Sequence, residues 1–209
     1  MIDLTAATKL GSGNGRTTYL HPDDPKLILK TETEPVKGRL RRYERPPNIR
    51  PSNYREIEGY SAMILRLGRA HDFLTRVYGW ESTSAGPALL AENATYALDD
   101  FTALNAMFKA PNKVTYSVHE IEWARQQYTE ISNLFCSLKI YNHGLKPESV
   151  GIGRRNGQLK MRLFDFKTIV YRQAVSLRYV PWAEHNSQMS KIRSVQSKFD
   201  CLLASKRTD

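Results

Sequence analysis

The sequence predicts a small α+β protein of two lobes, a β-rich lobe over residues 1–92 and a minimal helical lobe over residues 93–209. A glycine-rich turn between short strands opens the first lobe. A long apolar stripe at helical spacing, followed by a hairpin pattern, opens the second lobe. With 209 residues, 41% of them hydrophobic and 25% charged, the chain is long enough to bury a core.

The first element is the glycine-rich turn formed by Gly11, Gly13 and Gly15. Backbone N–H groups in such a turn can surround a phosphate, because no Cβ obstructs its approach. The segment Thr17–Leu20 has strand character and His21–Pro25 forms a turn, so no helix follows the glycines, which argues against a dinucleotide-binding loop. The absence of Gly-Lys-Ser/Thr excludes a Walker A loop. An ordinary glycine-rich hairpin is the alternative.

A short apolar strand, Leu27–Lys30, comes next and ends in lysine. It is followed by an amphipathic helix that starts at residue 52 or 53, where Asn53 and Glu56 have the spacing of a capping box. A buried lysine beside a phosphate needs a fixed carboxylate. We expect Glu56 to hold Lys30 and Glu58 to be solvated, and the alternative is that both acids lie on the surface.

The middle of the chain contains a strand and two helices. The segment Pro87–Glu92 is apolar, and the linker that begins at Glu92 is placed to bind an adenine through its main chain. A short helix is expected from Leu98, and Pro111 ends it. A capping box, Ser117 with Glu120, then opens the long core helix. Its apolar stripe comprises Val118, Ile121, Tyr128, Ile131, Leu134, Phe135 and Leu138.

A β-hairpin follows the long helix. Two runs of alternating character flank Asn156-Gly157, which is a strong signal for a tight hairpin turn. A hairpin brings its two ends together, so Ser149 before it and Asp165 after it should lie side by side. Such an arrangement suits a site for a metal and a triphosphate.

The segment Asn142–Ser149 resembles the catalytic loop of protein kinases, in which an Asp accepts the substrate proton and an Asn holds a second Mg²⁺. Here Gly144 and Ser149 occupy those two positions. Because glycine cannot act as a general base, phosphorylation of a hydroxyl should be severely slowed. Asp165, in the sequence Leu163-Phe164-Asp165-Phe166, corresponds to the metal-binding Asp.

These residues define the predicted site. Asp165 and Ser149 are the expected metal ligands, and Glu148 is an alternative to Ser149. Lys146 would neutralise a transferred phosphate, with a surface lysine as the alternative. His143 could serve as the base, or it is a structural loop residue. The nucleotide would contact Gly11, Gly13, Gly15, Lys30, Glu56 and Glu92.

Together the motifs resemble the YrbL family, the PhoP regulatory network proteins, within the protein-kinase-like superfamily. The resemblance rests on Leu10–Gly13, Tyr19 with His21–Pro25, Leu27–Lys30, Arg55-Glu56 with Tyr60, Leu145–Ser149 and Asp165. It implies a small bilobal protein-kinase-like fold with a minimal C-terminal lobe, and binding of ATP and Mg²⁺. Members of that family already depart from the catalytic Asp, and this sequence departs further at Ser149.

Three candidate functions follow. The first is a nucleotide-binding pseudokinase, or strongly divergent kinase, that regulates a protein partner. The second is an active atypical ATP-dependent transferase that modifies a protein or a small molecule. A third, a basic nucleic-acid-binding protein, comes from the net charge of +10, although no helix-turn-helix, zinc-finger or aromatic RNA-binding signature is present.

The remaining expectations concern location and cysteines. The sequence contains neither a signal-peptide pattern nor about 18 consecutive apolar residues, so we expect a cytoplasmic protein without a membrane span. Cys136 and Cys201 lie in helical contexts and are expected to be packed thiols, with no disulfide or metal framework.

Overall fold

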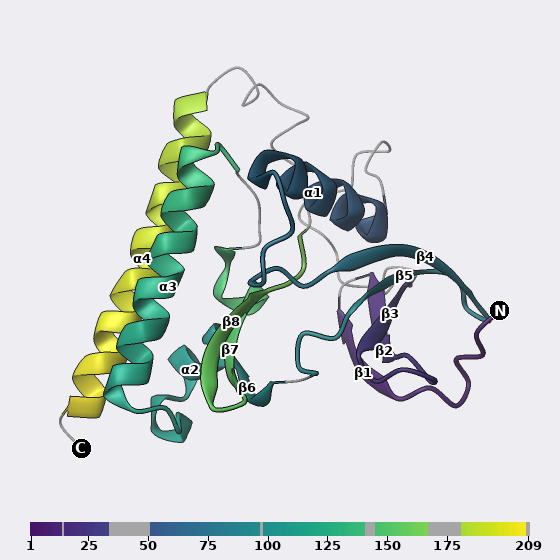
Figure 1. Cartoon of the computed structure of the whole chain (residues 1–209), viewed down its shortest axis with the longest axis horizontal. Helices are drawn as coiled ribbons and strands as arrows, with labels where there is room; N and C mark the ends of the chain where they lie inside the picture. The colour runs from purple at the N-terminus through teal and green to yellow at the C-terminus, as the bar shows by residue number, and fades with distance from the viewer. Residues whose placement is uncertain (14, 34–50, 97, 141–144, 167–180, 208–209) are drawn as a thin grey trace, which may run out of the picture.

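The structure is a computed structural model that describes residues 1–13, 15–33, 51–96, 98–140, 145–166 and 181–207. It confirms the α+β class, with a β-rich N-terminal region followed by a more helical C-terminal one (Figure 1). Within the described residues, every helix is too short or too polar to cross a bilayer.

Five of the described strands form an antiparallel sheet in the order β1-β2-β3-β5-β4. They are β1 (Lys9–Gly13), β2 (Arg16–Leu20), β3 (Leu27–Glu32), β4 (Val77–Thr83) and β5 (Gly86–Glu92). Side chains alternate between the two faces of a strand. Leu29 therefore packs with Leu4 and Ala88 on one face, whereas Lys30 is directed to the other.

Helix α1 (Ser52–Leu67) ends at Gly68, whose φ of 73° is the left-handed conformation that glycine adopts without strain. The predicted start is correct, but the predicted capping box is wrong. Pro51 is the cap residue and no side chain caps the helix. The Asn53 amide instead donates a 2.6 Å hydrogen bond to the carbonyl oxygen of Lys30, so a contact to the sheet replaces the local one.

The other described sheet has the order β6-β7-β8, formed by β6 (Asp99–Ala103), β7 (Val150–Arg155) and β8 (Gln158–Leu163). The helix expected from Leu98 is wrong in its first part: residues 99–103 are extended because they pair with β7, and helix α2 (Leu104–Lys109) starts only afterwards, before the 3-10 turn η1 (Pro111–Lys113). Between β7 and β8, Asn156 and Gly157 both have positive φ, which confirms the predicted turn.

Helix α3 (Val118–Ser137) carries the predicted capping box, since the Glu120 N–H donates to the Ser117 hydroxyl and the Ser117 N–H donates to the Glu120 carboxylate at 2.8 Å. Helix α4 (Pro181–Arg207) runs back alongside it (Figure 1). Cys136 on α3 is half-buried, but Cys201 is exposed on α4, so the expectation of a packed thiol is wrong there.

The main core lies between these helices, α1 and the second sheet. Its largest fully buried members are Met63, Leu104, Met107, Ile121, Tyr128, Phe135, Ile152, Leu163, Phe166 and Phe199. Because Leu163 and Phe166 belong to this core, the segment between them is anchored at both ends. That segment contains Asp165.

Candidate functional site

The predicted lysine and carboxylate meet on the inner face of the five-stranded sheet. Lys30 of β3 places its Nζ 2.5 Å from Oε1 of Glu56 in the first turns of α1. Lys30 is 7% exposed and Glu56 is 1% exposed, so the pair is shielded from water. The expected partnership between Lys30 and Glu56 is therefore formed.

Arg16, which was not among the expected site residues, completes this cluster. Its Nη1 contacts the second oxygen of the Glu56 carboxylate, and its Nη2 lies 2.8 Å from Oδ1 of Asp165. Arg16 thus bridges a carboxylate of the first lobe and one that follows β8. Strand alternation is the signal that could have identified it, because Thr18 pairs with Lys30 and Arg16 lies two residues away on the same face.

The ionisation of the cluster follows from its charge balance. Burial by itself would raise the pKa of Glu56, but the positive charges of Lys30 and Arg16 outweigh burial and hold that pKa below its usual range. Burial by itself would lower the pKa of Arg16. The negative charges of Glu56 and Asp165 outweigh burial, so the pKa of Arg16 is raised. These opposite charges balance one another, which is how a protein tolerates ions in its interior.

Asn53 fixes the geometry of the cluster from the first turn of α1. It is fully buried, and its Oδ1 accepts a 3.2 Å hydrogen bond from Nη1 of Arg16. Its own backbone N–H donates to the Glu32 carboxylate at 2.5 Å. Together with the bond to the Lys30 carbonyl, these contacts tie helix α1 to both β2 and β3.

Of the three glycines predicted to form a turn, only Gly15 lies in the turn that leads to Arg16. Gly11 and Gly13 lie in the exposed strand β1, and a Cβ added to either would meet no atom within 4 Å among the described residues. Packing therefore does not require glycine at these two positions, and the backbone stays open to a ligand. Gly15 has a φ of 92°, a conformation that requires glycine here for the turn into β2.

The two predicted metal ligands are brought together, as expected from the hairpin. The Phe164 N–H donates a 2.9 Å hydrogen bond to the Ser149 carbonyl, which places Asp165 beside the 3-10 turn η3 (Pro147–Ser149). However, the Asp165 carboxylate already binds Arg16, and Ser149 is 4% exposed. Among the described residues, no three His, Cys, Asp or Glu side chains are grouped to hold a metal. In this arrangement Arg16 of the protein itself pairs with the carboxylate that the sequence assigns to Mg²⁺.

The other predicted site residues are distributed as follows. Lys146 is half-buried and its carbonyl accepts the Ser149 N–H at 2.8 Å, while Glu148 is exposed. His143 and Gly144 lie outside the described residues. The Glu92 carboxylate contacts the Arg76 N–H at 2.9 Å and Arg162 at 2.5 Å, so it joins the end of β5 to β8 and its charge is already engaged.

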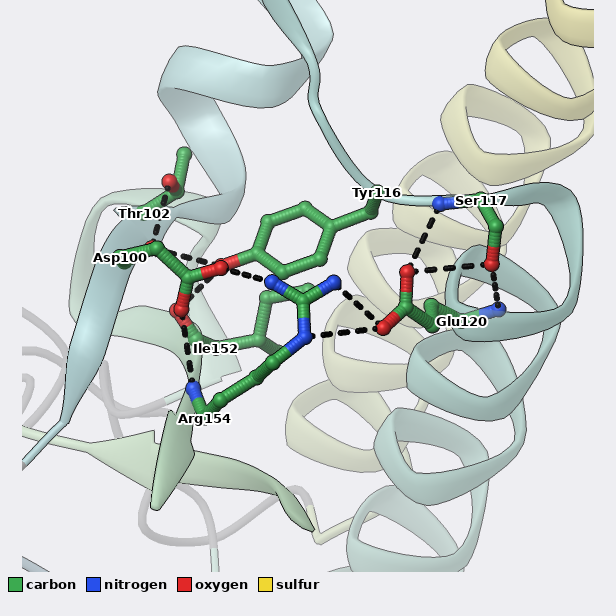
Figure 2. Close-up of polar contacts among 7 residues, drawn as sticks. All are labelled: Asp100, Thr102, Tyr116, Ser117, Glu120, Ile152 and Arg154. Carbon is green, nitrogen blue, oxygen red and sulfur yellow. Dashed lines mark hydrogen bonds and ion pairs between the residues drawn. The ribbon is translucent and has the colours of Figure 1, made fainter. Parts of the chain in front are cut away.

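A second polar network lies on the second sheet, centred on Arg154 (Figure 2). The Arg154 guanidinium contacts the carboxylates of Asp100 and Glu120, the latter with Nε to Oε1 at 3.0 Å. The Tyr116 hydroxyl donates to the Asp100 carbonyl at 2.7 Å. The Arg154 guanidinium lies over the Tyr116 ring. These contacts join β6, β7 and the start of α3, and we interpret the network as structural.

No protein-family model matches the chain, and no curated protein matches it. The resemblance to the YrbL family, and the kinase-like function that it implies, stay predictions from the sequence.

Proposed function

We propose that this chain is a kinase-like nucleotide-binding protein that acts in regulation as a pseudokinase, holding a nucleotide without Mg²⁺. The observation that carries the proposal is Arg16, whose guanidinium bridges Glu56 and Asp165. In an active kinase the corresponding Asp binds the metal that neutralises the phosphates. Here the permanently charged guanidinium of Arg16 binds that carboxylate instead.

Arg16 can take over part of the metal's electrostatic role. A guanidinium stays protonated at every physiological pH and recognises phosphate through paired N–H donors. Together with Lys30 and the open backbone at Gly11 and Gly13, it supplies donors of the kind that bind a polyphosphate. The nucleotide would then bind against protein cations and backbone amides instead of a metal complex.

Binding without phosphate transfer follows from the sequence as well. Gly144 stands where the general base is required, and a general base typically contributes about 10²- to 10⁴-fold to the rate. An atypical ATP-dependent transferase is the second candidate, favoured by the buried Lys30–Glu56 pair, which the site retains. A transferase of this kind would need Mg²⁺ to displace Arg16 from Asp165.

The test is a thermal-shift titration with ATP, in EDTA and in excess Mg²⁺, on the wild type and Lys30→Met. Ligand at about 100 times Kd stabilises by about 2.7 kcal/mol, and a chain of this size gains roughly 2–4 °C per kcal/mol. We expect equal shifts in EDTA and Mg²⁺, a lost shift in Lys30→Met, and an unchanged shift in the exposed control Arg193→Ala. No shift with the wild type contradicts nucleotide binding.

The transferase is tested in the same preparation by following transfer of radiolabelled γ-phosphate to protein and to water. We expect none from the wild type. The double variant Gly144→Asp with Ser149→Asn restores the kinase pattern and serves as the comparison. Metal-dependent transfer by the wild type would refute the pseudokinase and establish the transferase.

A further inference from the structure

A basic groove is lined by residues of both lobes. Its larger part is a cleft of about 680 Å³ between the turn before β3, the connection from α1 to β4, the end of β5 and the β7–β8 hairpin. A smaller cleft of about 390 Å³ shares residues 70–72 and Lys160 with it. The two clefts therefore adjoin one another along these shared residues, and we refer to them together as the basic groove.

Positive charge is concentrated in this groove. Among the described residues that line it, six cations oppose the carboxylates of Asp72 and Glu92, and the cations are Lys26, Arg69, Arg76, Arg155, Lys160 and Arg162. All except Arg162 are exposed. The cleft between α3 and α4 shows the contrast, with two arginines against three carboxylates among its described residues. A groove with an excess of positive charge attracts anionic ligands.

Arg162 also has unused hydrogen-bonding capacity. Its Nη2 contacts Glu92, but its Nε is buried and has no hydrogen-bond partner among the described residues. Buried donors are usually satisfied, so an incompletely satisfied guanidinium in a cleft wall is unusual. A modest movement of this side chain toward an anion in the groove would supply the missing acceptor.

Aromatic rings accompany the cations. Tyr78 is 53% exposed and Tyr96 is 40% exposed in the larger cleft, and Trp123 lines the smaller one. The Lys26 ammonium lies 5.9 Å from the centroid of the Tyr96 ring, so a cation and a π face are presented together. Exposed aromatic faces beside a positive groove are the features on which bases of single strands stack.

We propose that this basic groove binds single-stranded nucleic acid, with phosphates along the arginines and lysines and bases on Tyr78 and Tyr96. The adjacency of the two clefts favours an extended strand over a compact mononucleotide. RNA and DNA share the required phosphate and base chemistry, and the experiment distinguishes them. The site does not depend on the Lys30 cluster, which lines neither cleft.

The experiment measures fluorescence anisotropy of labelled oligouridine and oligothymidine 12-mers against salt concentration. For single strands the slope of log K against log salt is about −0.7 per phosphate contact, so the five exposed cations give a slope of up to about −3.5. The double variant Arg155→Ala with Lys160→Ala should reduce it to about −2.1. Tighter binding of one 12-mer identifies the natural sugar. Absence of binding at low salt overturns the proposal.

The matched control removes the same charge elsewhere, with Lys113→Ala and Arg193→Ala, both exposed and outside the groove. It should bind the oligonucleotide nearly as well as the wild type. Equal weakening in both double variants would show attraction by net charge alone and overturn the site. Tyr96→Ala should weaken binding at least about fivefold through lost stacking. Unchanged 12-mer binding by Tyr96→Ala overturns the assignment to nucleic-acid strands. So does a wild-type affinity for uridine monophosphate equal to that for the 12-mer.

A final comparison separates this proposal from the nucleotide site. Lys30→Met should bind the 12-mers as the wild type does, and the Arg155 and Lys160 double variant should keep its ATP-induced thermal shift. Loss of 12-mer binding in Lys30→Met would overturn a separate groove.

Discussion

Replacing Arg16 with methionine tests the central contact of the candidate site. The substitution keeps much of the apolar stem but removes the guanidinium that contacts Glu56 and Asp165. Removing one partner of a buried ion pair typically costs about 3–5 kcal/mol. Glu56 keeps Lys30, and the Asp165 side chain is 35% exposed, so solvent compensates part of the loss. We therefore expect a loss of about 2–3 kcal/mol.

The first assay is thermal and chemical unfolding of Arg16→Met beside the wild type. For a chain of this size the expected loss lowers Tm by roughly 4–12 °C. Arg16→Lys is the matched control, because it keeps the charge but cannot reach two carboxylates through a planar fork. The Tm of Arg16→Lys should fall between those of the wild type and Arg16→Met. Unchanged stability in Arg16→Met would refute the bridge.

The second assay asks whether the freed Asp165 carboxylate binds metal. The wild type should show no Mg²⁺-dependent stabilisation with ATP present, whereas Arg16→Met should acquire one. Asp165→Asn in the Arg16→Met background should remove it again. Mg²⁺-dependent stabilisation of the wild type would refute the reasoning that Arg16 excludes the metal.

Three further predictions concern acid unfolding, packing and the second polar network. Because the pKa of Glu56 is lowered in the folded state, the Glu56 carboxylate contributes to folding stability above its usual pKa of 4.5, and this contribution is lost as pH falls through the folded pKa. The stability of Glu56→Gln, measured by acid unfolding, should therefore depend less on pH than that of the wild type. Gly151→Ala puts a Cβ 2.3 Å from the Phe101 ring and should cost about 1–3 kcal/mol in urea unfolding, whereas Gly11→Ala should be near neutral. Arg154→Met should lower the midpoint of urea unfolding only slightly, because its ion pairs are partly exposed. No loss would show that the second network does not stabilise the fold.

Several elements could be predicted from the sequence because their signals are local. The Asn156-Gly157 turn, the capping box of Ser117 and Glu120, and the apolar stripe of α3 each depend on residues within a few positions of one another. The Lys30–Glu56 pair was also predicted, from a motif whose order along the chain is characteristic.

Other features were decided only by tertiary structure. Residues 99–103 became a strand because β7 supplies backbone partners, and Asn53 binds the sheet instead of capping its own helix. Arg16 and Asp165 are 149 residues apart in the chain, and the residues around each of them do not predict their contact. The sequence by itself determined the Asn156-Gly157 turn, the capping box of Ser117 with Glu120 and the apolar stripe of α3, because these signals are local. Tertiary packing decided which charged groups meet, because a buried charge is stabilised by whatever opposite charge the fold brings within reach.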